Sequence, residues 1–334
     1  MSKSKIAIEA VRRSGLKINA SELEDLLAGV AATPDHLWDC DWVELIAPDA
    51  SSSLKDVLVS ARDELAACIQ SQFSEGPSPK NRIAKLRERL RASDIDGFVV
   101  PRADAFMGES VPVHSERLRW LTGFSGSAGV AVVLIDRAAI FVDGRYTLQI
   151  RKQVDPAIYD IFNISEMTPW TWSANNLRKG SRLAFDPWLI TDTTQNNYQR
   201  KLIEIGAEFV AVERNLVDAV WDNQPAPPLA PVTNHSIRFA GKSSRNKRRS
   251  ISNELVQANQ DAALITSPDS IAWMLNIRGG DVPYAPLAHS FLVIFANEDV
   301  YWFIDKRKLL PEVVGSLRGE IIIDDISHIG PFLQ

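Results

Sequence analysis

The sequence is poor in the residues that bind metals and form disulfides. Its 334 residues include two cysteines, Cys40 and Cys68, and five scattered histidines. It has no Cys-x-x-Cys pair and no His-Glu-x-x-His segment, which are spacings that zinc and catalytic metal sites use. The sequence therefore predicts no metal site in this chain, and we expect the two cysteines to be buried thiols.

Long apolar runs and an excess of positive charge are also missing. No apolar run approaches the roughly 18 residues that span a bilayer, and the start "MSKSKIAIEA" lacks the apolar core and cleavage site of a secretory signal. The formal net charge is −5, whereas nucleic-acid-binding domains carry an excess of Lys and Arg. The basic run 242–250 has no interleaved aromatic residues and fits a solvated helix end. We expect a cytoplasmic protein that binds neither membranes nor nucleic acids.

The chain is long enough for at least two domains, because 334 residues are more than a single hydrophobic core usually organises. Residues 1–78 look helical: apolar side chains recur at spacings of three and four from Leu54 to Phe73, and the breaker "SEGPSPKN" follows. From Arg82, helical and strand-like segments alternate, which is typical of an α/β domain. Four prolines within 221–234 predict a stiff connector at the end of this domain.

The pattern of the α/β domain starts again after this connector. Four pairs of residues recur at offsets of 165, 165, 153 and 162 positions. They are Asp96 and Asp261, Asp104 and Asp269, Trp120 and Trp273, and Asp143 and Asp305. Nearly constant offsets over this distance indicate a duplicated domain with loop insertions. The sequence therefore predicts two copies of one α/β unit.

The segment "HSERLRWLTGFSGSAG", residues 114–129, joins a charged stretch to a glycine-serine turn. A serine nucleophile elbow requires Gly-x-Ser-x-Gly between a strand and a helix, but here Ser127 replaces the second glycine and a strand follows. The spacing of Gly123, Gly126 and Gly129 also differs from the Gly-x-Gly-x-x-Gly of dinucleotide sites. We expect these glycines to form a tight turn that leads into the strand "VAVVLI".

Two further features indicate structural roles. Trp120 and Trp273 are large aromatic residues on helices expected to face a sheet, so we expect them to pack in the core. In "NIRGGD", Arg278 and Asp281 are placed to form an ion pair that braces the glycine turn. From the residues themselves we predict no catalytic residue in this chain.

Five segments together resemble the cytosolic three-domain Xaa-Pro aminopeptidases, also called aminopeptidase P. In chain order they are "GES…ERLRWLTGFSGSAG", "FVDGRYTLQ", "FDPW", "DAVWDNQPAPPL" and "DSIAWMLNIRGGDVPYAPL". The likeness runs from about Arg82 to Gln334. It implies two tandem creatinase-type N-terminal α/β domains, with mixed sheets flanked by helices, preceded by a short all-helical segment.

The resemblance also implies domain boundaries and the location of the catalytic metal site. We expect a helical extension at 1–78, creatinase-type domain I at 79–222, and domain II at 235–334, truncated at its C-terminal end. Family members hold two divalent metals, usually manganese, in a C-terminal pita-bread domain and release an N-terminal residue that precedes proline. We expect that domain to be missing here, so we expect no cofactor in this chain and no hydrolysis by it alone.

In the family, the N-terminal domains mediate dimer contacts and contribute to the rim of the active-site cleft. By position the loop 106–126 resembles that rim, with Arg119 and Trp120 as candidate rim residues. Where relatives resemble "DAHQGEYV", the chain has "DAFMGESV". Histidine, glutamine and tyrosine are thereby replaced by Phe106, Met107 and Ser110. Fewer hydrogen-bonding groups would weaken polar substrate contacts at this loop.

The partners implied by the resemblance are a second copy, in a homodimer, and proline-containing peptides where the catalytic domain is present. Two functions from different classes stay open. The chain is the non-catalytic N-terminal portion of an Xaa-Pro aminopeptidase whose coding sequence continues beyond Gln334, or it is a stand-alone, inactive paralogue that acts as a binding or dimerisation module. A third alternative, a hydrolase that uses Ser125 or Ser127, has the least support.

Overall fold

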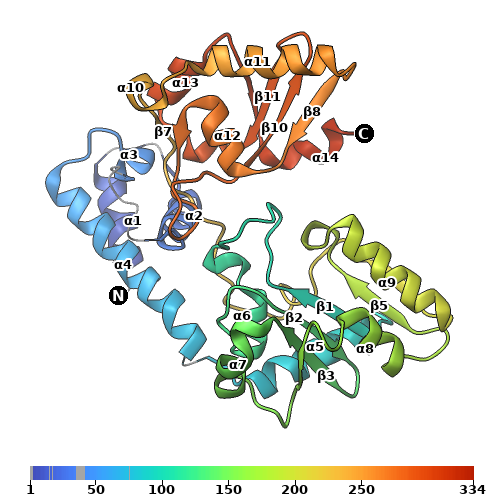
Figure 1. Ribbon diagram of the computed structural model, residues 1–334. Helices are drawn as coiled ribbons and strands as arrows, with labels where there is room; N and C mark the ends of the chain where they lie inside the picture. Colours follow the sequence, from blue (N-terminus) through green and yellow to red (C-terminus); the bar gives the residue numbers. More distant parts are fainter. Residues whose placement is uncertain (1–2, 15, 17, 35–41, 75) are drawn as a thin grey trace. The chain divides into compact units, whose positions relative to one another are not determined.

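The computed structural model describes residues 3–14, 16, 18–34, 42–74 and 76–334. The chain divides into two compact units: Gln70–Gln224 is one, and Met1–Ile69 together with Pro225–Gln334 is the other. Each unit contains a mixed β-sheet, and the second also contains helices from the start of the chain (Figure 1). Among the described residues, no helix is long and apolar enough to cross a membrane.

The unit Gln70–Gln224 is built around a six-stranded sheet in the order β4-β3-β2-β1-β5-β6. Its strands are β1 (Gly97–Pro101), β2 (Val130–Leu134), β3 (Ala138–Val142), β4 (Asp160–Asn163), β5 (Arg182–Phe185) and β6 (Glu208–Ala211). Pairs β1–β2 and β2–β3 are antiparallel, and the other three are parallel. Side chains alternate along β1, so Phe98 and Val100 belong to one core and Val99 to another. The continuous apolar runs of the sequence are therefore strands buried on both faces.

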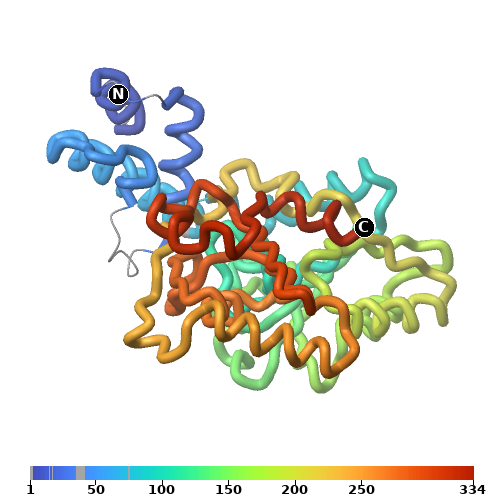
Figure 2. The backbone as a smooth tube through the Cα atoms, turned by 90° about the horizontal axis from the view of Figure 1, so that it is seen from above, coloured from blue at the N-terminus to red at the C-terminus, as the bar shows by residue number. Residues whose placement is uncertain are grey.

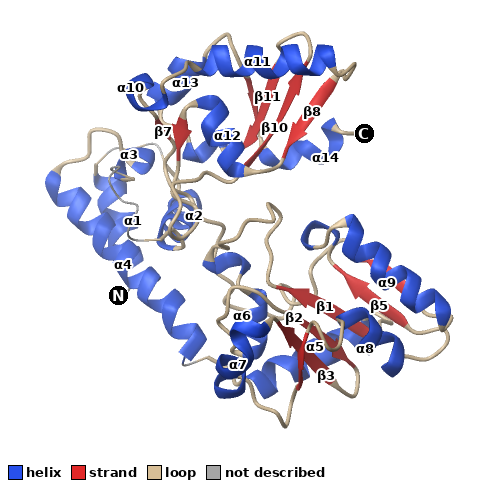
Figure 3. Ribbon diagram, viewed as in Figure 1, coloured by secondary structure: helices blue, strands red, loops and turns tan. Residues whose placement is uncertain are grey.

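Helices cover both faces of this sheet (Figure 3). They are α5 (Pro79–Ala92), α6 (Arg117–Thr122), α7 (Thr147–Gln153), α8 (Pro169–Asn176) and α9 (Asp192–Glu204). Buried Leu86 of α5 and Leu121 of α6 pack with the core that contains Phe98. Trp172 of α8 and Leu202 of α9 pack with the core that contains Val99. The result is a three-layer α/β unit, as the alternating pattern predicts.

The second unit contains a four-stranded sheet in the order β12-β11-β10-β8 and a small two-stranded sheet. The strands are β7 (Thr233–Asn234), β8 (Ala262–Ile265), β9 (Ile277–Arg278), β10 (Ser290–Phe295), β11 (Val300–Ile304) and β12 (Ile322–Asp324). The helices of this region are α10 (Ile237–Ala240), α11 (Ser244–Gln257), α12 (Pro268–Leu275), α13 (Pro311–Leu317) and α14 (Ile329–Phe332). Its core gathers around Trp302, which is fully buried.

The two sheets repeat one topology. Strand β1 pairs antiparallel with β2, β2 antiparallel with β3, and β3 parallel with β4; β8, β10, β11 and β12 repeat these pairings in the same order. The helices before them match as well, since Ser78 caps α5 and Ser243 caps α11 through the same backbone contact. After the third strand, Asp143 binds Arg145 and Asp305 binds Arg307 in identical 3-10 turns. The predicted duplication is confirmed.

The start of the chain forms a group of helices, which also appears together in Figure 2. They are α1 (Lys3–Arg13), α2 (Ala20–Ala31), α3 (Val43–Ile46) and α4 (Ser52–Ser74). They share a core with Leu229 from the proline-rich connector. Of the stripe predicted from Leu54 to Phe73, Leu54, Leu58 and Ala61 are buried, so the prediction holds for the first part of α4. The helical segment at the start of the chain is thus as predicted.

The expected burial of the cysteines is wrong for Cys68, which is exposed. Cys68 lies on α4, and the described core contacts of that helix run along Leu54, Leu58 and Ala61 instead. Cys40 lies outside the described residues. The predicted domain boundaries at 78/79, 222 and 235 stay predictions.

Candidate functional site

The loop that resembles an active-site rim, residues 106–126, is fixed by charged side chains. Arg102 donates from Nη1 to the carbonyls of Glu109 (2.9 Å) and Ser127 (3.1 Å), and its Nη2 lies 3.7 Å from the carboxylate of Glu116. At the start of the loop, buried Asp104 accepts a hydrogen bond from the backbone N–H of Phe106 at 2.9 Å. Burial raises the pKa of both carboxyl groups, Asp104 and Glu116. Both ends of the loop are therefore anchored.

A second anchor is the ion pair between Arg117 of α6 and Asp218. It is bidentate, with Nε–Oδ1 at 2.7 Å and Nη2–Oδ2 at 2.8 Å, and Arg117 is buried. Gln224 donates from Nε2 to Asp218 at 2.9 Å and to the carbonyl of His114 at 3.1 Å. The sequence gives no local signal for this network, although "DAVWDNQPAPPL", which contains Asp218, is one of the segments that carry the family resemblance. The planar guanidinium holds the loop to the segment after β6 in one geometry.

Of the two candidate rim residues, Trp120 lies in the core of its unit. It is 4% exposed and stacks on Trp221, with ring centroids 5.1 Å apart and an interplanar angle of 16°. The guanidinium of Arg82 lies 5.1 Å from the Trp120 ring centre and donates to its carbonyl. Arg119 is half-buried, with its guanidinium 4.4 Å from the ring centre of Phe73. The expectation of core packing holds for Trp120, and the rim roles stay predictions.

The three glycines of the turn lie where a side chain would be unfavourable, for different reasons. Gly123 ends α6 with φ +84°, a left-handed conformation that favours glycine. A Cβ on Gly126 would lie 2.2 Å from the ring of Phe124, and one on Gly129 would lie 3.2 Å from Leu118. Strand β2 begins directly afterwards at Val130. The turn is tight because an aromatic ring packs against it.

The serines of the turn are hydrogen-bonded to glutamine and tyrosine side chains, and neither serine contacts a histidine or a carboxylate in these bonds. Ser125 Oγ accepts hydrogen bonds from Gln149 (3.2 Å) and Gln153 (2.8 Å). Ser127 Oγ lies 2.5 Å from the phenol oxygen of Tyr146, and this hydrogen bond lowers the pKa of Tyr146. A serine nucleophile needs a base such as histidine within hydrogen-bonding reach. These contacts give no support to a serine hydrolase.

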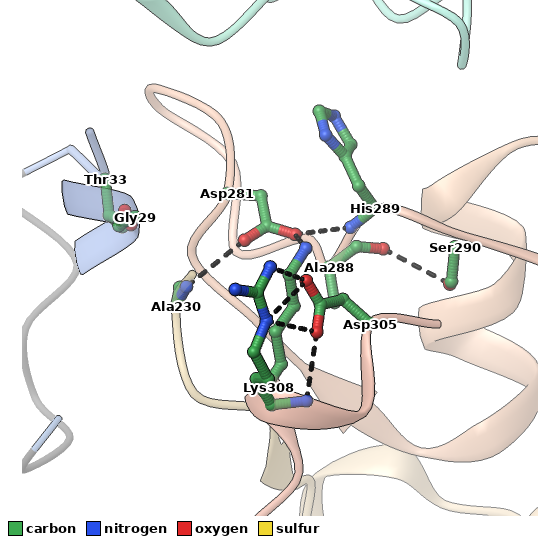
Figure 4. Close-up of polar contacts among 10 residues, drawn as sticks. Gly29, Thr33, Ala230, Asp281, Ala288, His289, Ser290, Asp305 and Lys308 are labelled. Atoms are coloured by element: carbon green, nitrogen blue, oxygen red, sulfur yellow. Dashed lines mark hydrogen bonds and ion pairs between the residues drawn. The ribbon is translucent and has the colours of Figure 1, made fainter. Parts of the chain in front are cut away.

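In the second unit, Asp281 lies at the centre of a buried polar cluster (Figure 4). Its carboxylate is fully buried and lies 2.6 Å from Nζ of Lys308, which is also buried. It also accepts from the backbone N–H of His289 at 2.6 Å and of Ala230 at 3.3 Å. Burial raises the pKa of Asp281, and the Lys308 ammonium opposes that rise. The cluster joins the proline-rich connector to the loop before β10 and to the turn after β11.

The predicted ion pair between Arg278 and Asp281 is wrong, because Asp281 binds Lys308 and Arg278 donates to the carbonyls of Ala272 and Ile277. The predicted core packing of Trp273 is also wrong. Trp273 is 51% exposed, with Nζ of Lys247 4.6 Å from its ring centre. Its burial would need a covering segment from outside its own helix.

The side chains of this chain also bear on metal binding. In the part of the chain that the structure describes, no group of three or more His, Cys, Asp or Glu residues is arranged to hold a metal ion. Dinuclear hydrolytic sites need several carboxylates around ions about 3.5–4 Å apart. The described residues therefore do not fit the two manganese ions that the family resemblance implies.

Known proteins share both α/β domains. Two family models, both described as Creatinase/Prolidase N-terminal domain, match residues 82–220 and 223–334. Probable Xaa-Pro aminopeptidase P of Verticillium alfalfae is 37% identical over 246 residues, which cover 72% of this chain and 40% of the relative. Aminopeptidase P1 of Lotus japonicus is 34% identical over 241 residues, with 71% and 36% covered.

A solved structure gives the same result. The X-prolyl aminopeptidase of Caenorhabditis elegans, described as a cytosolic enzyme with a di-nuclear active site, matches with a TM-score of 0.72 and 28% identity. The match covers 77% of this chain and 44% of that protein. The chain thus spans about two fifths of the length of these relatives. It belongs to the creatinase/prolidase N-terminal domain family, carries two such domains in succession, and corresponds to the N-terminal portion of Xaa-Pro aminopeptidase P.

Proposed function

We propose that this chain acts as the non-catalytic N-terminal portion of an Xaa-Pro aminopeptidase-like metallopeptidase, in a cytoplasmic homodimer. The observation that carries the proposal is the succession of two creatinase-type domains, aligned over 246 residues with an Xaa-Pro aminopeptidase P. The reaction would be release of an N-terminal residue that precedes proline. The two metal ions of that reaction would be held by residues outside these two domains.

The part proposed for this chain is to form the rim of the cleft and to contribute to the dimer. The anchored loop 106–126 supports the rim assignment, because Arg102, which directly follows β1, and Arg117, which pairs with Asp218 after β6, hold it in place. Rigid elements position contact residues better than free loops do. Arg119 is the residue of this loop that we assign to substrate contact, since it is half-buried and Trp120 is in the core.

The test is a fusion of the full chain to the part of the Verticillium relative that follows the aligned segment. We expect the chain alone to show no cleavage of Xaa-Pro peptides above background with added manganese, and the fusion to cleave them. In the fusion, Arg119→Ala is expected to raise KM several-fold, whereas Arg89→Ala, at an exposed site on α5, leaves KM unchanged.

Hydrolysis by the chain alone would contradict the non-catalytic role. A folded fusion that binds manganese and still fails to cleave would contradict the assignment to this enzyme. An unchanged KM in the Arg119→Ala fusion would remove the rim role and leave the rest of the proposal standing.

A second candidate function, a stand-alone binding or dimerisation module, is favoured by the altered loop "DAFMGESV". Met107 presents an apolar side chain that is 49% exposed, at a residue with φ +54°. We expect light scattering of the purified chain to give the mass of a dimer under both functions. The module function is contradicted if the chain binds neither itself nor a full-length relative.

A further inference from the structure

The two domains repeat one contact between a basic residue and a tryptophan. Arg82 of α5 and Lys247 of α11 are related by the same offset of 165 positions as the duplicated aspartates. Arg82 lies over the ring of Trp120 on α6 and donates to its carbonyl. Lys247 lies over the ring of Trp273 on α12 and donates to its carbonyl at 2.9 Å. Each cation covers one face of its tryptophan and binds the end of the helix.

The helix ends correspond too. Gly123 and Asn276, both left-handed with φ +84° and +54°, follow the two tryptophans by three residues. In the second domain, the side chain of Asn276 accepts from Lys247 at 2.7 Å and donates to the carbonyl of Lys242 at 3.0 Å. In the first domain, Arg82 donates from Nη2 to the carbonyl of Gln72, before α5, at 2.9 Å. The tryptophan, the cation and the segment before the basic helix are therefore held together in both domains.

The other face of the tryptophan differs between the domains. In the first domain it is covered by Trp221, whose ring also meets Phe73 edge-on at 6.0 Å. In the second domain Trp273 is 51% exposed. Phe239, which precedes the capping serine of α11 much as Phe73 precedes that of α5, is 74% exposed. The second domain thus has counterparts of Trp120 and Phe73, namely Trp273 and Phe239, and both are exposed. Its described residues include no counterpart of Trp221.

We propose that the exposed face of Trp273 binds an aromatic side chain of another polypeptide, presented on a short acidic segment. The chain itself contains such a segment, residues 215–224, in which Trp221 stacks on Trp120. There the flanking acids are bound by cations: Asp218 by Arg117, and Asp222 by Lys85 at 2.7 Å. We take this segment as the pattern for the occupant, which is an acidic, aromatic peptide.

The segment 235–253, whose Lys247 lies over the ring of Trp273, complements such a peptide in charge. Residues 235–253 contain six Lys and Arg residues and no Asp or Glu, in a chain of net charge −5. Arg245 and Arg248 pair with Glu320, and Arg249 pairs with Glu298. The others are Arg238, Lys242 and Lys247, for which the described residues provide no carboxylate within ion-pair distance. Burial, Arg278 and Lys242 lower the pKa of Lys247, so this cluster of cations is stabilised by an incoming anion.

The test uses the synthetic peptide NLVDAVWDNQ, which copies residues 215–224, and the full chain with 15N-labelled tryptophan indoles. We expect a saturable shift of the Trp273 indole resonance, with a dissociation constant on the order of 0.1–1 mM. The Trp273→Ala chain lacks this reporter, so its affinity and that of the parent are compared by the fluorescence anisotropy of a labelled peptide; the variant is expected to bind at least fivefold more weakly. Trp188→Ala is the matched control, because Trp188 is 53% exposed in the other unit, and it should bind as the parent does. Raising the salt concentration should weaken binding.

Three results would overturn the proposal. One is equal binding by the Trp273→Ala chain. Another is equal binding by a peptide with alanine in place of its tryptophan, since attraction would then be charge alone. The third is self-association of the parent chain that disappears in Trp273→Ala, because a second copy would then occupy this face. The exposure of Trp273 makes unfolding of the variant a minor concern, and its circular dichroism spectrum checks this.

Discussion

At the scale of single residues, the buried Asp281–Lys308 pair shows how burial changes the free energy lost when one partner of an ion pair is removed. Both side chains are almost inaccessible, so each charge depends on the other and on the backbone N–H groups of His289 and Ala230. Removing one partner leaves a buried charge without compensation. The exposed pair of Lys85 and Asp222 has nearly the same geometry, at 2.7 Å, but water solvates both groups.

We therefore predict that Asp281→Asn destabilises the unit that contains Pro225–Gln334 by about 3–5 kcal/mol. Asp222→Asn should cost less than about 1 kcal/mol. The double variant Asp281→Asn/Lys308→Met should recover much of the loss, because it removes the isolated buried charge. Urea denaturation measures all three, and equal costs for the two single variants would refute the argument from burial.

A second residue-scale prediction concerns pH. The backbone N–H of Asp325 at 2.8 Å, then His328 at 3.1 Å, lower the pKa of Asp324 from 3.8 to about 2. A depressed pKa means that the folded state favours the carboxylate, so this contribution to stability is present above pH 3.8 and is lost as the pH falls through about 2. A carbon-13 NMR titration should give a midpoint near 2 for Asp324. His328→Ala should raise the midpoint only partly, since the larger cause remains, and a parent midpoint near 3.8 would contradict the assignment.

At the scale of helices and strands, the duplicated tryptophans give a prediction with an internal control. Trp120 on α6 is 4% exposed beneath Trp221, whereas Trp273 on α12 is 51% exposed. Trp120→Ala should destabilise its unit by about 3–5 kcal/mol because it leaves a cavity in the core. Trp273→Ala should cost about 1 kcal/mol or less. Thermal unfolding of the two variants tests this, and similar losses would mean that the exposed face of Trp273 is already covered in solution.

Comparison of the two duplicated domains shows which features a single sequence can predict and which it cannot. The duplication was predictable, because Asp143 and Asp305 keep their spacing and form the same turn with the arginine two residues later. The partner of Asp281 was not, because Lys308 lies 27 residues further along the chain and is brought close by the β11 turn. The exposure of Trp273 was missed for a related reason: burial of its counterpart depends on Trp221, a hundred residues away in sequence.

The candidate site also contains one part that the sequence predicts and one part that it does not. The glycine turn before β2 could be predicted from local spacing, since φ, ring contacts and strand start are properties of neighbouring residues. The network of Arg117 with Asp218 joins residues 101 positions apart and has no local signal. Long-range polar contacts of this kind are set by the packing of the sheet and its helices, which a single sequence does not encode in any periodic pattern.

At the scale of the whole molecule, the proline-rich connector does more than join two copies of a domain. Leu229 is buried in the core of the N-terminal helices, and its backbone N–H donates to the carbonyl of Gly29 at 3.0 Å. A Cβ on Gly29 would lie 2.5 Å from the side chain of Leu229, so the helix α2 approaches the connector through its glycine. Next to it, Ala230 donates to Asp281 and Val232 donates to the carbonyl of Lys308. The connector thus fastens the first helices of the chain to its last domain.

This arrangement predicts that weakening the connector affects parts of the chain that are far apart in sequence and spares the domain between them. Leu229→Ala should cost about 2–5 kcal/mol, because a fully buried leucine is truncated in a packed core. In hydrogen exchange, α2 and the loop around Asp281 should lose protection together, whereas β1 to β3 of the other unit should keep theirs. Gly29→Val should give the same pattern through a clash instead of a cavity, and Gly144→Ala, at a glycine with open space around its Cα, serves as the control. Loss of protection confined to the helices of residues 3–69 would show that the connector does not couple them to the last domain.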